Sequence, residues 1–167
     1  MNLMYKITRL LVLLFCCFAL LTACSANAAR SDLVAIADVL TKEGFSGELQ
    51  KDLQDKIKYA NSDDEIISVL KYFSDKLNTT QQKLRNLKMR NNEVNKARND
   101  LADSLESMSN IIEKITQTDL HDSAQLEKIK QEMNEEEKKL QNATQQILQI
   151  SQKYRVRNME NYVNGKK

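Results

Sequence analysis

The chain has 167 residues, a formal net charge of +2 at pH 7, no proline and three glycines. So few turn-forming residues argue against a β-sandwich or β-barrel, which needs a turn signal about every 8–12 residues. The nearly balanced charge argues against a protein that binds nucleic acid, because such proteins carry a strong basic excess. We therefore expect an all-α protein with no nucleic acid among its partners.

The chain starts with a cationic segment and a short apolar run. Lys6 and Arg9 precede the apolar residues 10–23. As a helix this run would span about 21 Å, less than the roughly 30 Å hydrocarbon core of a bilayer. A cationic start, a short apolar core and small residues at its end are typical of a cleaved signal peptide. The sequence therefore predicts that residues 1–23 are removed.

The apolar run ends in Leu21-Thr22-Ala23-Cys24. This tetrapeptide resembles the lipobox of bacterial lipoproteins. The resemblance implies cleavage between Ala23 and Cys24, lipidation of Cys24 with a diacylglyceryl group, and attachment to a membrane outside the cytoplasm. It also implies that Ser25 is compatible with sorting to the outer membrane, so an outer-membrane or surface location is the expectation.

An ordinary signal peptidase site is the alternative. Ala26-Asn27-Ala28 fits the small-x-small pattern of that enzyme, which would release a soluble protein beginning at Ala29. We favour lipidation because Cys24 lies directly against the apolar core. Two or three acyl chains on Cys24 would give stable anchoring, where a single chain is marginal.

Cysteine and histidine are too scarce for a disulfide or a His/Cys metal site. Cys16 and Cys17 lie in the predicted signal peptide, Cys24 would carry lipid, and His121 is the single histidine. The mature protein is therefore expected to have no disulfide, no bound metal and no cofactor, and to be held together by packing alone.

Two short helices are predicted after a tether at 24–30. Ser31-Asp32 is expected to begin the first helix, and Gly44 to end it, because glycine readily takes the left-handed conformation at a helix end. The second helix carries Leu49, Leu53, Ile57 and Ala60 on one face. These helices are expected to pack against the start of the helix that follows, giving a partial three-helix bundle.

A long heptad pattern follows a predicted capping box at Ser62 and Glu65. From Ile66 to Ile115, apolar residues alternate at spacings of four and three, with twelve of fifteen seam positions apolar. The pattern predicts one coiled-coil helix over about 63–115, roughly 78 Å long.

Asn91 and Arg98 are polar residues at seam positions of this pattern. A polar seam residue reduces stability and can fix the register or the oligomeric state of a coiled coil. The two residues are therefore candidate register or oligomer determinants, and chance occurrence in an asparagine-rich chain is an equal alternative. Under the seam interpretation, replacing Asn91 with leucine would raise the melting temperature.

A second heptad helix is predicted after a break at Thr116–Ser123, capped by Asp122 or Ser123 and extending to Tyr154. Two such helices joined by a short connector are expected to form a long antiparallel coiled-coil hairpin. The lipid end and the C-terminus would then lie at one pole and the turn at the other. A homodimer formed by coiled-coil pairing is a further possibility.

No set of residues in the sequence predicts catalysis. His121 lies in a polar turn, and Glu135-Glu136-Glu137 lies beside lysines on a solvated helix, where Glu135 and Lys139 form an ordinary i,i+4 pair. The basic residues within 83–98 could attract an anionic partner, but without interleaved aromatic residues they are more typical of a hydrated helix flank. We therefore expect a protein that is not an enzyme.

The predicted organisation is a signal peptide at 1–23, a lipidated tether at 24–30, two short helices at 31–61, the hairpin at 62–162 with its turn near 116–123, and a basic tail at 163–167. The lipobox, the Lys/Asn-rich helical composition and the hairpin together resemble small helical surface lipoproteins of spirochaetes, including the factor H-binding type. That resemblance implies a surface protein that binds a protein partner of unknown identity through its helices and its turn. A structural or accessory lipoprotein of the periplasm is the alternative.

Overall fold

The structure is a computed structural model that describes residues 26–45, 47–119 and 121–156. The regular elements of these residues are all helices, which confirms the predicted all-α fold. They are a helical segment at 26–42, α2 (Gly47–Lys58), α3 (Asp63–Arg85), α4 (Asn92–Thr116) and α5 (Ser123–Lys153).

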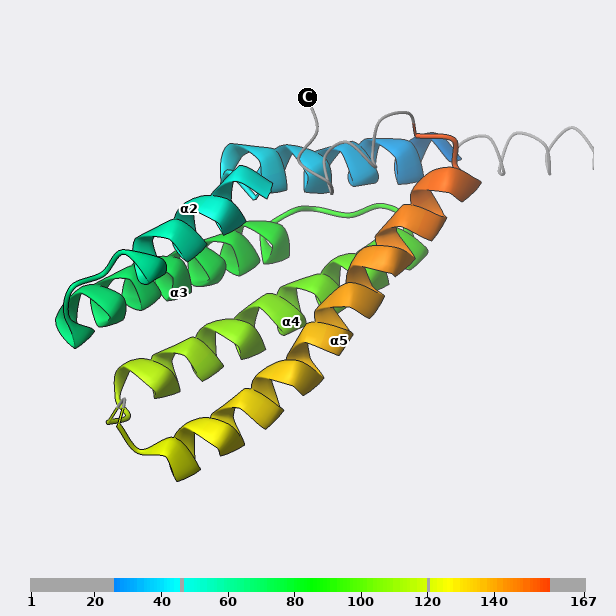
Figure 1. Cartoon of the computed structure of the whole chain (residues 1–167). Helices are drawn as coiled ribbons and strands as arrows, with labels where there is room; N and C mark the ends of the chain where they lie inside the picture. The colour runs from blue at the N-terminus through cyan, green and yellow to red at the C-terminus, as the bar shows by residue number, and fades with distance from the viewer. Residues whose placement is uncertain (1–25, 46, 120, 157–167) are drawn as a thin grey trace, which may run out of the picture.

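The helices pack as an antiparallel bundle (Figure 1). α3 and α4 run in opposite directions along each other, and α5 returns along α4. α2 packs against α3, as expected for the second short helix. The segment 26–42 instead extends beyond the end of α3, toward the end of the bundle where α4 begins and α5 ends.

The predicted continuous helix over 63–115 is wrong. α3 ends at Arg85 and α4 begins at Asn92, so the chain reverses direction within six residues. The Ser74 and Ser109 hydroxyls lie 2.8 Å apart, and each also donates to the other residue's backbone carbonyl. In one straight helix they would be about 52 Å apart. The seven-heptad coiled coil is therefore divided into two shorter helices that bury their apolar faces against each other.

The predicted tether and the start of the first helix are also corrected. Residues 26–30 are already helical, and Ala29 is fully buried, so no extended tether precedes the bundle in this part of the chain. Asp32 does not cap a helix start. Its buried carboxylate accepts hydrogen bonds from the backbone N–H groups of Arg90 and Asn91, at 2.7 and 2.8 Å, and so supports the loop between α3 and α4.

Three predicted helix ends are confirmed. Gly44 has φ of 70° at the end of the first helical segment. The Ser62 hydroxyl accepts from the Glu65 N–H, although the Glu65 carboxylate returns to the N–H of Asn61 rather than to that of Ser62. The Asp122 carboxylate accepts from the Gln125 N–H at the start of α5.

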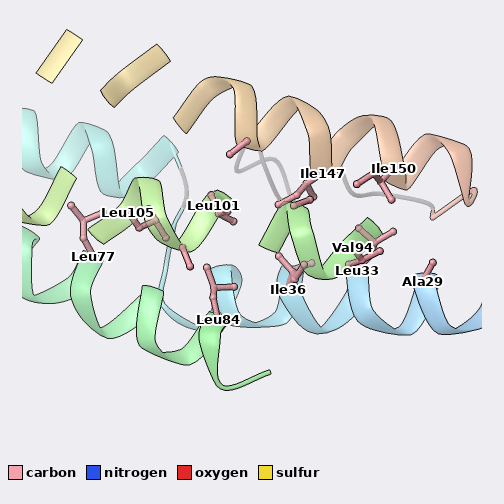
Figure 2. Packing of buried hydrophobic residues seen from close by; sticks show 14 of the residues in the cluster. Ala29, Leu33, Ile36, Leu77, Leu84, Val94, Leu101, Leu105, Ile147 and Ile150 are labelled. Atoms are coloured by element: carbon pink, nitrogen blue, oxygen red, sulfur yellow. The ribbon is translucent and has the colours of Figure 1, made fainter. Parts of the chain in front are cut away.

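The hydrophobic core joins the segment 26–42 to α3, α4 and α5 (Figure 2). Leu33 and Ile36 on the N-terminal segment, Leu84 on α3, and Val94 on α4 are each 0% exposed. α5 covers this cluster with Ile147 and Ile150. Leu77 of α3 lies in the core near Leu105 of α4.

The two poles of the bundle differ in which segments they contain. At one pole, the Arg30 Nε donates to the Tyr154 carbonyl at 2.7 Å, which joins the start of the first helix to the end of α5. At the other, the His121 Nε2 lies 3.3 Å from the Asp63 carboxylate, which brings together the turns before α3 and before α5. The N-terminal side of the described chain and the end of α5 therefore lie opposite the 117–122 turn, as the sequence predicts. We call these ends the anchor pole and the distal pole.

Candidate functional site

Exposed aromatic side chains gather where α2 lies beside α3. Among the described residues, the exposed large apolar side chains are Val34, Ile57, Tyr59 and Tyr72, and the last three belong to α2, the turn after it, and α3. Tyr59 is 68% exposed and Tyr72 is 51% exposed. Tyrosine offers apolar area and a polar tip together, so it is enriched where proteins bind other proteins.

Lysines surround these rings. Lys56 of α2 and Lys76 of α3 place their ammonium groups 5.7 and 5.8 Å from the centre of the Tyr72 ring, and Lys58 lies 5.2 Å from the centre of the Tyr59 ring. A cation this close to the face of an aromatic ring is attracted by about 0.5–1 kcal/mol at an exposed site. We call Lys56, Ile57, Lys58, Tyr59, Tyr72 and Lys76 the aromatic surface.

The local sequence holds α2 in position for this surface. Asp52 and Lys56, four residues apart on α2, form an ion pair at 2.8 Å, and the hydrogen bond and charge of Asp52 raise the pKa of Lys56 above its ordinary value. Leu53 is buried, one turn before Ile57. Lys83 of α3 forms an ion pair with Glu43, which links the chain just before α2 to α3. The sequence did not predict the aromatic surface, since Tyr72 of α3 becomes a neighbour of Lys56 only through the packing of α2 on α3.

Asn91 is an N-cap rather than a coiled-coil seam residue. Its side-chain oxygen accepts hydrogen bonds from the backbone N–H groups of Glu93 and Val94, both at 3.0 Å. These are two of the N–H groups that the first turn of a helix leaves without a helical partner. The position therefore stabilises the start of α4, and the seam interpretation of Asn91 is wrong.

Replacing Asn91 with leucine is accordingly expected to destabilise the protein by about 1–2 kcal/mol, because α4 loses its cap. This is opposite to the higher melting temperature that the seam interpretation predicts. Urea unfolding of Asn91→Leu and of Asn91→Ser, which keeps a capping oxygen, measures the effect. A leucine variant as stable as the wild type would contradict the capping role.

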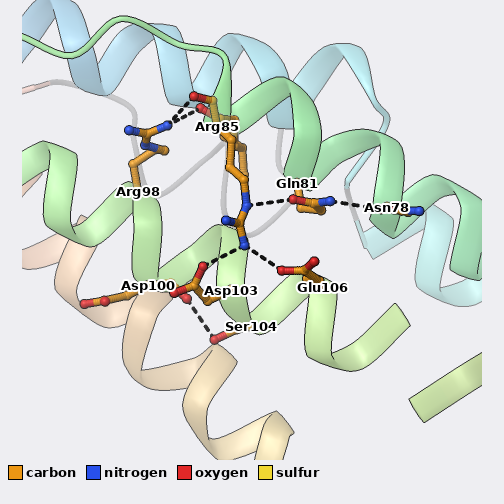
Figure 3. A network of polar contacts seen from close by, with 9 residues as sticks. Asn78, Gln81, Arg85, Arg98, Asp100, Asp103, Ser104 and Glu106 are labelled. Atoms are coloured by element: carbon orange, nitrogen blue, oxygen red, sulfur yellow. Dashed lines mark hydrogen bonds and ion pairs between the residues drawn. The ribbon is translucent and has the colours of Figure 1, made fainter. Parts of the chain in front are cut away.

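Arg98 caps the end of α3 from the facing helix (Figure 3). It is 8% exposed, and its Nη1 donates to the carbonyls of Leu84 and Arg85 at 2.9 and 2.7 Å, while Nη2 donates to the Asn95 side chain. The last carbonyls of a helix lack helical partners and carry partial negative charge, so a buried cation there is favourable. Burial, and secondarily the charge of Arg85, lower the pKa of Arg98 below its ordinary value.

The basic run at 83–98 does not form one free cationic face. Arg85 bridges Asp103 and Glu106 of α4 at 2.8 and 2.6 Å (Figure 3). Lys83 pairs with Glu43, and Arg98 is buried. Lys88 and Lys96 have no ion-pair partner among the described residues and remain exposed.

The other polar candidates behave as solvated surface groups. The His121 side chain is 82% exposed beside Asp63. Glu136 pairs with Lys139 at 2.6 Å, one residue away from the predicted partner Glu135, and raises the pKa of that lysine. The described residues contain no cluster of three or more His, Cys, Asp or Glu side chains arranged to hold a metal ion.

Two shallow grooves of about 580 and 520 Å³ run between α4 and α5. The first lies at the distal pole beside Lys114, Lys128 and Glu132, and the second at the anchor pole beside Glu93 and Lys153. Lys114 pairs with Glu132 and Lys153 with Glu93, so part of the charge in each groove is already neutralised. The described linings of the two grooves contain no aromatic side chain, so the aromatic surface is the stronger candidate for binding a protein partner.

The predicted lipidation and cleavage residues, Ala23 and Cys24, lie outside the described residues. Within the described part of the chain, no helix is both long and apolar enough to cross a membrane.

Comparison with known proteins identifies one family. Residues 30–155 match the profile of the family described as "Uncharacterised lipoprotein PM1805". No curated protein and no solved structure matches the chain. The match supports a bacterial lipoprotein, and nothing in the comparisons supports the resemblance to the spirochaete factor H-binding type.

Proposed function

The chain belongs to this lipoprotein family, and from that premise we propose that it is acylated at Cys24 and holds its helical bundle at a membrane of the cell envelope. There it has a non-catalytic role, which is to bind a protein partner through the aromatic surface on α2 and α3. An outer-membrane or surface location follows from Ser25, by the sorting pattern that the lipobox resemblance implies.

The position of Ala29 supports cleavage before Cys24 over cleavage before Ala29. Ala29 is fully buried within a helix that already includes residues 26–28. Cleavage before Ala29 would remove the first turn of this helix and place a charged α-amino group on a residue of the core. A positive charge at a helix N-terminus opposes the helix dipole, and a charge beside the apolar core is unfavourable. A chain that begins at Cys24 keeps this helix and its core contacts.

The exposed tyrosines carry the proposal of protein binding. Tyr59 and Tyr72 are large, partly apolar side chains, and Lys56 and Lys76 already lie over the Tyr72 ring from two helices. Aromatic side chains with few rotatable bonds lose little conformational entropy on binding, so they are effective interface anchors. Three lysines on the same surface favour a partner with acidic groups around an apolar contact.

Photo-crosslinking in living cells tests this proposal. A photoreactive phenylalanine analogue at Tyr72 is expected to give a discrete adduct with another envelope protein, and Tyr59→Ala with Lys56→Ala is expected to reduce its yield at least fivefold. The matched control carries the analogue at Lys138, an exposed position on α5. Adducts of equal yield from both positions, or none from Tyr72, would refute recognition by the aromatic surface.

The mass of the adduct separates the remaining possibilities. An adduct of twice the mass of the chain would assign the aromatic surface to a homodimer, and so would refute a different protein as partner. Protease digestion of intact cells distinguishes a surface protein, whose bundle is cleaved, from a periplasmic accessory lipoprotein, whose bundle is protected.

A further inference from the structure

Charge is distributed unequally between the two poles of the bundle. The segments at the anchor pole are 26–32, 86–98 and 150–156, and they contain seven basic and two acidic residues. The basic residues are Arg30, Lys88, Arg90, Lys96, Arg98, Lys153 and Arg155. The turns at the distal pole, 59–65 and 117–122, contain five acidic residues and no lysine or arginine, and the ends of α2 and α4 that lead into them carry Lys56, Lys58 and Lys114.

Direct contacts hold the three basic segments together. Arg30 donates to the Tyr154 carbonyl at 2.7 Å, and Lys153 lies 2.7 Å from the Glu93 carboxylate. Asp32 binds the backbone of the loop before α4. Both acidic residues of this pole are therefore engaged: Asp32 is buried, and Glu93 has its pKa lowered by Lys153.

The exposed cations at the anchor pole are therefore mostly free to meet an outside partner. Lys88, Lys96 and Arg155 are exposed and have no ion-pair partner among the described residues. Arg90 is 66% exposed, and its Nε is 3.9 Å from the Asp32 carboxylate. Few side chains on the protein itself neutralise this group.

The short distance along the chain to Cys24 indicates which partner this is. Residue 26 is the first described residue, is already helical, and follows Cys24 by two residues. Two residues span at most about 7 Å, even when fully extended. If Cys24 is acylated, as the proposed function states, this link holds residue 26, at the start of the anchor pole, within about 7 Å of the lipidated residue. The start of the first helix is then held within about one Debye length, roughly 8 Å at physiological salt, of the membrane anchor.

We propose that the anchor pole is a membrane-docking surface that binds anionic phospholipid headgroups, such as phosphatidylglycerol, through Lys88, Arg90, Lys96 and Arg155. The acyl chains and these cations both attach the protein to the membrane, and both act at the same end of the molecule. The bundle stands on its basic pole, and the acidic distal pole is repelled from the same lipids. The aromatic surface, which lies along the distal part of the bundle, is thereby presented away from the bilayer.

Vesicle binding by the unacylated body, residues 25–167, tests the docking surface without the anchor. This body keeps the whole buried core, which lies within residues 29–150, and circular dichroism verifies its fold. Each lysine or arginine near an anionic surface strengthens binding roughly fivefold. The body is expected to sediment with vesicles of phosphatidylglycerol and phosphatidylethanolamine at low salt, and not with phosphatidylcholine vesicles or in 0.5 M NaCl.

The variants are matched in charge and differ only in position. Lys88→Glu with Lys96→Glu is expected to weaken binding at least tenfold. Lys128→Glu with Lys138→Glu, which changes two exposed lysines on α5 that lie away from the anchor pole, is expected to stay within twofold of the wild type. Equal losses in both variants, or equal binding to anionic and neutral vesicles, would overturn the proposal.

The anchor itself is tested separately. Intact-mass measurement of the membrane-purified protein shows whether Cys24 carries acyl chains. A missing acyl increment would refute the proposed anchoring, whereas the vesicle experiment would still decide whether the pole binds anionic lipid. Failure of the docking surface and failure of the proposed function are therefore distinguishable.

Discussion

The double variant Ser74→Cys/Ser109→Cys is expected to form a disulfide on mild oxidation of the 25–167 body, which has no other cysteine. The two serine hydroxyls lie 2.8 Å apart in the buried interface of α3 and α4, so cysteine sulfurs at these positions come within bonding reach. A continuous helix would separate them by about 52 Å. Non-reducing electrophoresis and mass spectrometry measure the crosslink.

The crosslink is also expected to stabilise the protein. It closes a loop of about 35 residues, which in the chain-entropy treatment raises the free energy of unfolding by about 3–4 kcal/mol. The free energy of unfolding of each variant is also measured after reduction, which gives the value for the same variant without the crosslink. The control pair Ser74→Cys/Ser151→Cys joins α3 to the far end of α5 and is expected to remain reduced within a monomer. Efficient oxidation of the control pair, or failure of the 74–109 pair, would contradict the antiparallel packing.

Replacing Asp32 with alanine is expected to lower the free energy of unfolding by about 3 kcal/mol. The Asp32 side chain is 4% exposed, and one of its oxygens accepts from two backbone N–H groups of the loop that reverses the chain. Each buried donor left without an acceptor costs about 1–3 kcal/mol. Chemical denaturation monitored by circular dichroism measures the loss.

Two further variants identify the cause. Asp32→Asn keeps an oxygen that can accept these bonds and is expected to lose less stability than alanine. Asp38→Ala changes an exposed aspartate on the same helix and is expected to be close to neutral, because surface changes usually stay within about 0.5 kcal/mol. If Asp32→Ala and Asp38→Ala were equally stable, the loop would not depend on Asp32.

Much of the candidate site is a product of packing. The basic residues near 83–98 could be read from the sequence, but which of them remain exposed depends on acids far away in the chain, such as Glu43 for Lys83 and Asp103 for Arg85. Tyr72 lies beside Lys56 because α2 docks on α3. Such pairings join residues that no local pattern connects.

The sequence by itself determined the helical class and several helix ends, because those depend on local chemistry. The lack of proline, the glycine at 44 and the capping side chains of Ser62 and Asp122 act within a few residues of their own positions. The same is true of the Asp52–Lys56 pair.

Only the tertiary structure decided that the chain reverses at 86–91. Leu84 and Asn91 occupy seam positions of the heptad pattern that are seven residues apart. The six-residue loop between α3 and α4 therefore leaves the seam positions of α4 in the same heptad phase as those of α3. The spacing of apolar residues along the sequence cannot reveal such a loop. Local propensity permits either a helix or a turn there. The turn is chosen because it buries α3 against α4 and lets Asp32 and Arg98 bind the backbone groups that a broken helix exposes.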